Sequence, residues 1–160
     1  MIGIMSDSHD NITAVRQAVS LFNSVGCELV LHAGDFVAPF SAKEFGCLAC
    51  PVKAVFGNCD GEKKGLETIL RPFGEIRPEP FSFRFREVHI LLTHLPFSNS
   101  DHAEAGNHDI LVFGHTHKPE IRRDKGTLLI NPGETGGWVS GSKTVAVLNP
   151  ADMDVEIISL

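Results

Sequence analysis

The chain has 160 residues, of which 42% are hydrophobic and 21% charged, enough for a single domain, 1–160, with a sizeable core. A formal net charge of −6 argues against general affinity for duplex nucleic acid, which requires a basic surface. No apolar run reaches the roughly 20 residues of a membrane helix, and no signal-peptide pattern is visible. We therefore expect a cytoplasmic protein without a membrane partner.

The first half of the chain alternates between strand and helix patterns. Asn11 is a predicted N-cap, and the apolar residues after it recur at spacings of three and four until Gly26, as on one face of a helix. This alternation predicts a parallel sheet with right-handed crossovers. The expected strands are 1–6, 28–32 and 52–56, and the expected helices lie between Asn11 and Gly26, over 39–45 and over 61–71.

The second half changes to strands joined by turns. Residues 72–80 are rich in turn formers, and the stretch 81–86 then alternates phenylalanine with polar residues, which predicts a half-buried strand. We expect this strand to pair with 89–93 in a hairpin that turns at Glu87-Val88. After a polar segment, 98–108, further strands are expected at 109–113, 120–123, 127–131, 143–148 and 154–158. The pattern predicts a mixed α/β domain with two packed sheets covered by helices.

Short polar motifs follow the apolar runs at five places. In open α/β sheets, ligands and catalytic groups gather at the carboxyl ends of the strands, so we expect these motifs to converge in one crevice. The motifs are Asp7-Ser8-His9, Gly34-Asp35, Gly57-Asn58-Cys59-Asp60, Thr93-His94 and Gly114-His115-Thr116-His117.

The polar residues in these motifs have the chemistry of metal ligands. Asp7 and His9 are two positions apart, so both point to the same side of an extended chain, and the two histidines of the last motif repeat that spacing. Carboxylate, imidazole and amide ligands suit Mn, Fe, Co, Ni or Zn better than Ca or Mg. Seven ligands are too many for one tetrahedral ion and suit two ions sharing a carboxylate. They are Asp7, His9, Asp35, Asn58, His94, His115 and His117.

Such a pair of ions indicates phosphate chemistry. Two metals about 3.5–4 Å apart can stabilise the attacking and leaving oxygens at phosphorus, and they lower the pKa of bound water to near 7. Two dications opposed by two carboxylates and a hydroxide leave a locally positive pocket on an acidic protein. No Walker-type glycine loop is present, which argues against a nucleotide-triphosphate switch.

In order and type, the motifs resemble the signature of the calcineurin-like metallophosphoesterase superfamily: D-x-H, G-D, G-N-x-D/E, a lone H and G-H-x-H. The resemblance is strongest to its compact bacterial and archaeal phosphodiesterases, which are related to the small retromer subunit of eukaryotes. It implies an α/β fold with a four-layer α/β/β/α sandwich of two mixed sheets flanked by helices. It further implies one metal held by Asp7, His9, Asp35 and His117, and a second held by Asp35, Asn58, His94 and His115.

The resemblance implies a phosphodiesterase in which a metal-bridging hydroxide attacks the phosphodiester. Manganese is the most expected metal, with nickel, iron, cobalt or zinc as alternatives. The expected substrate is a small phosphodiester, and cyclic nucleotides, short nucleic-acid ends and other small diesters stay unranked. The alternative is a weakly active or inactive scaffold or binding protein on the same fold, and a monoester or protein phosphatase is a third possibility. A homo-oligomer is compatible with the sequence.

The chain departs from the larger phosphatases of the superfamily at Cys59, where they carry a histidine that assists the leaving group. A thiol can donate a proton, so we place Asn58, Cys59 and Asp60 as catalytic candidates. Asp60 can position Cys59 or a water, and a purely structural role is equally expected. Leu95-Pro96 departs from the Gly-His that relatives often carry after the lone histidine.

Several other residues are candidates for lesser roles. His32 is expected in the core or behind the ligands. Asn131-Pro132-Gly133 resembles a loop of the compact subfamily, which implies that it lines the cleft without ligating. For His89, His102 and His108 a solvated position is favoured. His102 and His108 lie in a stretch that can still reach the substrate. Arg122, Arg123 and Trp138 are candidates for the rim, but solvated surface or packing is the favoured role for them. The spacing of Cys47 and Cys50 suits a zinc or redox motif, but no second pair completes it, so structural or incidental thiols are expected there.

Overall fold

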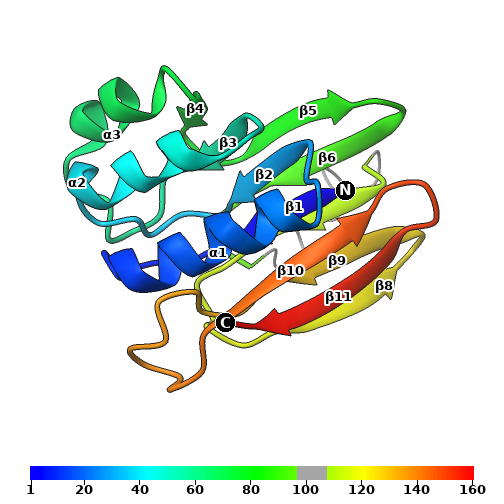
Figure 1. Cartoon of the computed structure of the whole chain (residues 1–160). Coiled ribbons are helices and arrows are strands. Elements are labelled where there is room, and N and C mark those ends of the chain that lie inside the picture. The colour runs from blue at the N-terminus through cyan, green and yellow to red at the C-terminus, as the bar shows by residue number, and fades with distance from the viewer. Residues whose placement is uncertain (97–107) are drawn as a thin grey trace.

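A computed structural model describes residues 1–96 and 108–160 as two packed β-sheets with helices on one side (Figure 1). The six-stranded sheet contains, in spatial order, β11 (Asp154–Ser159), β10 (Thr144–Asn149), β1 (Ile2–Met5), β2 (Leu29–His32), β3 (Val52–Val55) and β4 (Gly74–Arg77). The five-stranded sheet contains β5 (Phe81–Phe85), β6 (Val88–Leu92), β7 (Ile110–Val112), β9 (Thr127–Asn131) and β8 (Glu120–Asp124).

Both sheets are mixed. Strands β1 to β4 run parallel to one another, whereas β10 and β11 are antiparallel to their neighbours. In the second sheet, β6, β7 and β9 are parallel and the two outer strands, β5 and β8, are antiparallel. The predicted parallel start, the hairpin of β5 and β6 and the antiparallel pair at the C-terminus are confirmed. Four parallel strands in one sheet and three in the other therefore each have their carboxyl ends at one edge of their sheet.

The helices are α1 (Ile12–Ser24), α2 (Pro39–Ala42), α3 (Lys63–Leu70) and a 3₁₀ helix, η1 (Lys43–Cys47). Asn11 caps α1 as predicted, because its side-chain oxygen accepts a hydrogen bond from the Ala14 N–H at 3.2 Å. Phe22 of α1 packs directly on the backbone of β1, where a Cβ on Gly3 would lie 2.6 Å from its ring. Only glycine permits this close approach of helix and sheet.

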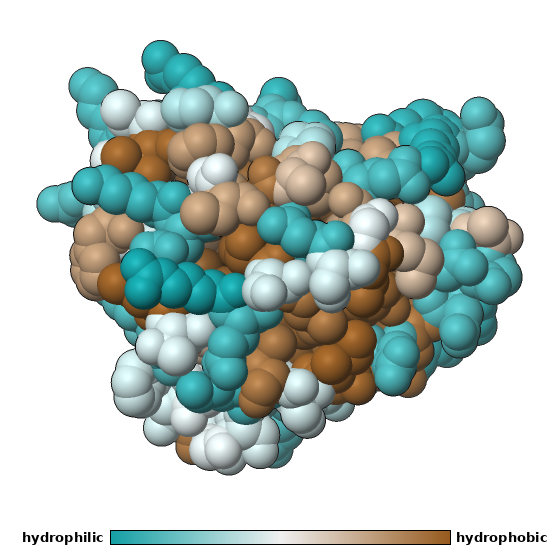
Figure 2. Space-filling view, in the orientation of Figure 1, coloured by the Kyte–Doolittle hydropathy of each residue, from teal (hydrophilic) through white to brown (hydrophobic). Residues whose placement is uncertain are grey.

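The core follows the alternation of the strands. Side chains such as Ile4, Leu31 and Ile110 fill the space between the sheets, while Met5, Val30 and Phe22 belong to the layer beneath the helices. A third buried cluster lies on the other face of the second sheet: Leu91, Leu111, Phe113 and Leu129. In Figure 2, apolar side chains gather over β10 and β11 beside α1, where Ile158 and Leu160 are partly buried.

The expected fold class is confirmed as a mixed α/β fold of two mixed sheets. Every helix within the described ranges covers the six-stranded sheet. The described residues therefore form three of the four expected layers: the helices, the six-stranded sheet and the five-stranded sheet. Most of the polar segment expected at 98–108, including His102, lies outside the described residues. None of the described helices is long and apolar enough to cross a membrane.

Two local predictions were wrong. Residues 72–80 were expected to be turns, but β4 forms there at the sheet edge, paired with β3. Only Ile76 in β4 is buried, so the strand lacks the apolar pattern that identifies one from sequence, and its pairing partner stabilises it. The β5–β6 turn lies at Arg86-Glu87, one residue earlier than expected, with Arg86 at a φ of +54°.

Candidate metal centre

The predicted motifs all lie at one edge of the two sheets. Asp7 follows β1, Asp35 follows β2 and Asn58 follows β3, while His94 and His115 follow β6 and β7 of the other sheet. Since both sheets place the carboxyl ends of these parallel strands together, side chains from two sheets face one another. The structure brings all seven expected ligands into this cluster.

The backbone at the cluster is held in an uncommon conformation. Five expected ligands have φ between +40° and +66°, a region that residues other than glycine rarely occupy. Each lies in a loop that follows the carboxyl end of a strand, where a left-handed residue can reverse the chain. Strain of this kind, about 1–3 kcal/mol per residue, persists where the surrounding fold enforces it, often at functional sites. The five are Asp7, His9, Asp35, His115 and His117.

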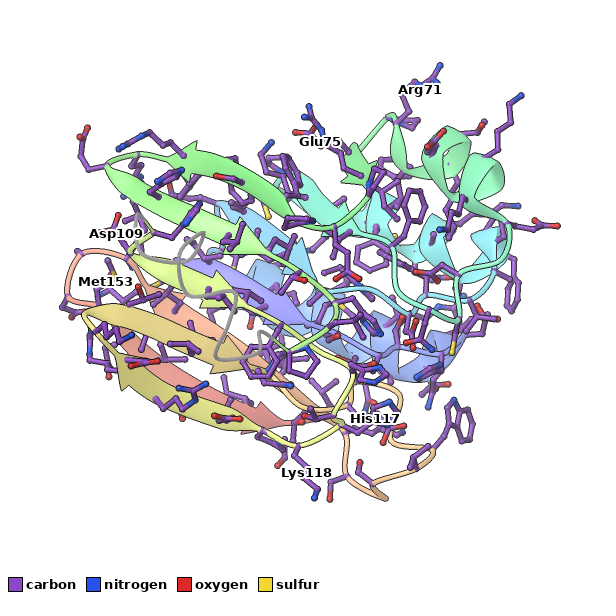
Figure 3. The ribbon with its side chains drawn as sticks, turned by 180° about the vertical axis from the view of Figure 1, so that it is seen from behind. Arg71, Glu75, Asp109, His117, Lys118 and Met153 are labelled. Carbon is purple, nitrogen blue, oxygen red and sulfur yellow. The ribbon has the colours of Figure 1, made fainter. Side chains whose placement is uncertain are left out.

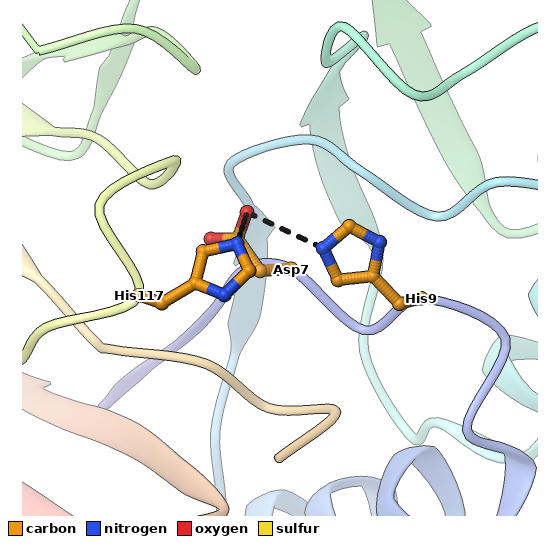
Figure 4. Close-up of side chains that lie close together, drawn as sticks. All are labelled: Asp7, His9 and His117. Carbon is orange, nitrogen blue, oxygen red and sulfur yellow. Dashed lines mark ion pairs between the residues drawn. The ribbon is translucent and has the colours of Figure 1, made fainter. Parts of the chain in front are cut away.

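One half of the cluster is formed by Asp7, His9 and His117, with Asp35 beside them (Figure 4). The Asp7 Oδ1 atom lies 3.9 Å from His9 Nε2 and 3.4 Å from His117 Nε2. His9 Nε2 also lies 3.7 Å from Asp35 Oδ2. These four side chains are the set that the family resemblance assigns to the first metal.

The other half contains Asp35, Asn58, His94 and His115. The Asn58 Oδ1 atom lies 2.8 Å from His94 Nε2 and 3.0 Å from His115 Nδ1, and His94 Nε2 is 3.5 Å from Asp35 Oδ2. The Nδ1 atom of His94 is 2.8 Å from the Ala33 carbonyl, which can only accept a hydrogen bond. With Nδ1 donating to that carbonyl, the other ring nitrogen, Nε2, faces the oxygens of Asn58 and Asp35.

A cation fits this donor set. Within the described parts of the chain, two atoms that face the cluster, Asp7 Oδ1 and His9 Nε2, are buried without a hydrogen-bond partner. Asp7 and Asp35 are 0% and 2% exposed, and burial raises the pKa of Asp7 above its usual value. Buried lone pairs and carboxylates that face one another are unfavourable alone, and a divalent ion would stabilise them.

Glycines make the cluster compact. A Cβ on Gly57 would lie 2.1 Å from Asp35 Oδ1, and a Cβ on Gly34, whose φ is +92°, would lie 2.7 Å from His94 Nδ1. The backbone after β2 and β3 can therefore approach the ligands only because these positions carry no side chain. This explains the glycine before Asp35 and before Asn58 in the motifs.

His32 lies behind the ligands, as expected. Its Nδ1 atom accepts from the Gly34 N–H at 3.2 Å, so Nε2 donates to the Ser8 hydroxyl at 3.0 Å. The ring is fully buried and stacks on Phe36 with centroids 3.6 Å apart. Burial, with smaller effects from nearby histidines, lowers the pKa of His32 well below its usual value. A neutral imidazole thus joins the two loops that carry Asp7 and Asp35.

Asp60 holds the backbone around Asp35. Its carboxylate accepts hydrogen bonds from the N–H groups of Asp35 at 3.1 Å, Val37 at 2.7 Å and Gly57 at 2.7 Å. Burial raises the pKa of Asp60, while these hydrogen bonds oppose the shift. Of the alternatives left open by the sequence, the contacts of Asp60 favour the structural one.

Two carboxylates that the sequence did not single out, the buried Glu134 and the half-buried Glu79, position residues of the cluster. Glu134 Oε2 lies 3.5 Å from His117 Nδ1, so the opposite nitrogen of that ring faces Asp7. Glu79 accepts from the N–H groups of His94 at 2.5 Å and Leu95 at 3.0 Å, and from the Thr93 hydroxyl at 2.6 Å. Burial alone would raise the pKa of both carboxyls, but the hydrogen bonds outweigh it and lower the pKa.

The sequence contains a weak signal for these residues. Glu134 directly follows Asn131-Pro132-Gly133, and Glu79 stands between two prolines, so each lies in a turn beside a predicted strand. Asn131 is fully buried and donates to the Gly114 carbonyl at 2.9 Å, which holds the loop of His115 and His117. The loop after β9 thus supports the ligands rather than contributing one.

The exposed side of the cluster is formed by Asn58, Cys59 and His115, whereas Asp7, Asp35 and His94 are buried. The Cys59 N–H donates to Asp35 Oδ1 at 2.8 Å, and its Sγ lies within 4.8 Å of ligand atoms of His9 and Asp35. Desolvation, then the hydrogen bond to Asp35, raises the pKa of the Cys59 thiol to about 11. The thiol is therefore protonated near the site.

The remaining candidates lie elsewhere. His108 precedes β7 and its Nε2 is 2.8 Å from the Ser82 hydroxyl. Figure 3 shows its neighbour Asp109 far from His117, so the reach of His108 toward the substrate that the sequence left open is not found. Arg122 and Arg123 are exposed on β8. Trp138, in contrast, lies at the site, since its Nε1–H donates to the His9 carbonyl at 3.0 Å.

Comparisons with known proteins agree with this geometry. The family model described as the calcineurin-like phosphoesterase superfamily domain matches residues 1–153. A phosphodiesterase of Methanocaldococcus jannaschii is 35% identical over 152 residues, 92% of each chain. The solved structure of an archaeal phosphodiesterase is 33% identical and has a TM-score of 0.93, covering 99% of both chains. Vps29 of Entamoeba histolytica, solved in complex with Zn²⁺, is 19% identical with a TM-score of 0.71, covering 99% of this chain and 97% of Vps29.

The fold and the buried ligand cluster are those of a metal-dependent phosphoesterase. The chain belongs to the calcineurin-like phosphoesterase superfamily, since the family model spans nearly all of it and a curated relative exceeds 30% identity over most of both chains. The likeness to Vps29 shows a shared fold.

Proposed function

We propose that this protein is a dinuclear-metal-dependent phosphodiesterase in which hydroxide derived from water attacks the phosphorus of a small phosphodiester. The observation that carries the proposal is the cluster of seven ligand side chains whose lone pairs face one another at the strand ends. The names of the archaeal relatives support diester rather than monoester hydrolysis.

The side chains divide into two sets that share Asp35. Asp7, His9 and His117 would complete the first set, and the second set would be completed by the three ligands Asn58, His94 and His115. Divalent ions, when bound there, supply Lewis-acid stabilisation of phosphate charge and lower the pKa of water to near 7. Manganese is our first choice, with nickel, iron, cobalt and zinc as alternatives, because the ligands combine imidazole with carboxylate.

The protein's own groups bind and orient the substrate. Two buried carboxylates offset only part of the charge of two dications, so the pocket attracts a phosphate anion although the chain is acidic overall. The exposed edge at Asn58, Cys59 and His115 is the side from which the ester would enter. The protonated Cys59 thiol lies at that edge and is our candidate to assist the leaving group. We also propose a cytoplasmic location, which the free cysteines support.

The proposal is tested with metal-free protein to which manganese or nickel is returned. A bis-aryl phosphodiester should be hydrolysed only after metal is added. Asp35→Asn and His115→Ala should lose this turnover and bind less metal by elemental analysis. Asp154→Asn, the same carboxylate-to-amide change at an exposed position in β11, is the control and should keep both. Absence of metal-dependent turnover in the unmodified protein would contradict the proposal.

A scaffold on the same fold is the alternative function. The fold shared with Vps29 is compatible with it, but a scaffold has no need of metal ligands, and this chain retains all seven. Five of them also occupy unfavourable backbone conformations, which cost about 1–3 kcal/mol each. A scaffold that binds no metal would have no use for this strain. The ligand set therefore favours the enzyme.

A further inference from the structure

One aromatic residue stands at the metal centre without being buried. Trp138 is 66% exposed, and its indole Nε1–H donates to the backbone carbonyl of His9 at 3.0 Å. His9 is one of the expected ligands, so the edge of the indole is attached to the ligand loop while most of its surface faces solvent. The chain contains one tryptophan and no tyrosine.

The loop that carries Trp138 is tightly held. The Glu134 carboxylate accepts the N–H groups of Trp138 at 2.7 Å, Val139 at 3.0 Å and Ser140 at 2.7 Å. The Oε2 atom of the same carboxylate also lies 3.5 Å from His117 Nδ1. One buried group therefore fixes both a ligand and the backbone of the indole.

The beginning of the loop lies directly on the ligand loop. The Gly136 N–H donates to the Asp7 carbonyl at 2.9 Å, and the Asn11 side chain donates to the Gly136 carbonyl at 2.7 Å. A Cβ on Gly136 would lie 2.9 Å from the Ser8 carbonyl oxygen, so only glycine permits this approach. In Figure 1, the loop between β9 and β10 projects from the molecule near the beginning of α1.

This arrangement does not serve packing. A tryptophan that stabilises a core is largely buried, whereas Trp138 and the 77% exposed Val139 leave their apolar surface in water. Holding an exposed ring in one orientation prepares it to bind a flat partner, because the entropy of ordering the side chain is lost before binding. Stacking of bases on aromatic side chains is a common and sequence-tolerant mode of binding nucleotides.

We propose that Trp138 stacks on the base of a nucleotide phosphodiester and selects such esters over aliphatic ones. The inference rests on the proposed function and deepens it, because it ranks nucleotide esters first among small diesters. The base would belong to the part of the substrate that stays on phosphorus, and Trp138 touches only that part. No bond is made or broken by Trp138, so its effect is on recognition.

Binding can be measured apart from turnover, since Trp138 is the only tryptophan. Protein loaded with Zn²⁺, which does not quench fluorescence by paramagnetism, is titrated with thymidine 5′-monophosphate or with ribose 5-phosphate while tryptophan emission is recorded. We expect saturable quenching by the nucleotide and little change with the sugar phosphate. Equal responses to both compounds, or none to either, would contradict stacking.

Turnover is compared with two esters that share the p-nitrophenol leaving group. One is the p-nitrophenyl ester of thymidine 5′-monophosphate and the other is ethyl p-nitrophenyl phosphate. Trp138→Leu should lower the ratio of kcat/KM for the nucleotide ester to that for the ethyl ester by about ten-fold. Trp138→Phe keeps a ring without the Nε1–H and should retain most of the ratio.

The control is Val139→Ser, which removes apolar surface from the same loop and keeps the backbone contact with Glu134. It should leave the ratio unchanged. An equal fall in Val139→Ser, or an unchanged ratio in Trp138→Leu, would overturn the inference while metal-dependent turnover of both esters still supports the proposed function. If neither ester is hydrolysed by the unmodified protein with manganese, the proposed function itself fails.

Discussion

Replacing Glu134 by glutamine removes a charge that links His117 to the loop 138–140. Both carboxylate oxygens accept backbone N–H groups, at distances from 2.7 to 3.2 Å. Glutamine offers one acceptor oxygen, so its NH₂ group must face a backbone N–H, and one buried donor stays unpaired at a cost of about 1–3 kcal/mol. At roughly 2–4 °C per kcal/mol for a domain of this size, we expect Tm to fall by about 5 °C.

The same change should weaken metal binding. Glu134 faces His117 Nδ1, and loss of the group behind a ligating histidine typically lowers metal affinity by about 10–100-fold. Isothermal titration of metal-free protein with manganese, at a temperature where the variant is folded, measures this effect. Glu120→Gln, the same substitution on exposed strand β8, is the control and should bind as the unmodified protein does. Unchanged affinity in Glu134→Gln would refute the positioning role.

Three further predictions concern the ligand loops. Gly57→Ala should weaken metal binding by about ten-fold or more, since its Cβ would lie 2.1 Å from the Asp35 carboxylate. In the same titration the control Gly61→Ala should have no effect, because a Cβ there has no atom within 4 Å. The pKa of His32 is lowered, so below about pH 6.5 the unfolded chain binds a proton that the folded chain excludes, and stability falls as pH falls. His32→Gln should flatten this slope in urea unfolding between pH 7 and 5, and an equal slope would contradict the assignment. Cys59→His should speed hydrolysis of esters with poor leaving groups relative to p-nitrophenyl esters, and an unchanged ratio would place Cys59 outside the proton path.

The ligand motifs could be predicted because their information is local. Each polar group stands directly after an apolar run, and in parallel sheets that position is a carboxyl strand end. Asp7, Asp35 and His115 were therefore expected together before any contact was known, and the structure places them so. The capped helix after Asn11 was predictable for the same reason, since cap and helical face lie within one short segment.

The supporting groups could not be ranked in this way. Asp60, Glu79 and Glu134 bind backbone N–H groups, and many acidic residues in turns could do so. Strand β4 was missed because its own residues are mostly polar and its stability comes from pairing with β3. The sequence left open whether His108 reaches the substrate, because sequence distance from His115 says nothing about which end of β7 each residue occupies.

The sequence alone indicates which strand ends carry the expected ligands. Apolar periodicity and the turn after each strand are both set by a few consecutive residues. Folding alone brought together groups such as His115 and Asp7, 108 positions apart, and Trp138 and His9, 129 positions apart. Contacts of that kind depend on how two sheets pack and which loops meet at their edge. Which carboxylates support the ligands, and which aromatic ring stands beside them, are consequences of that packing.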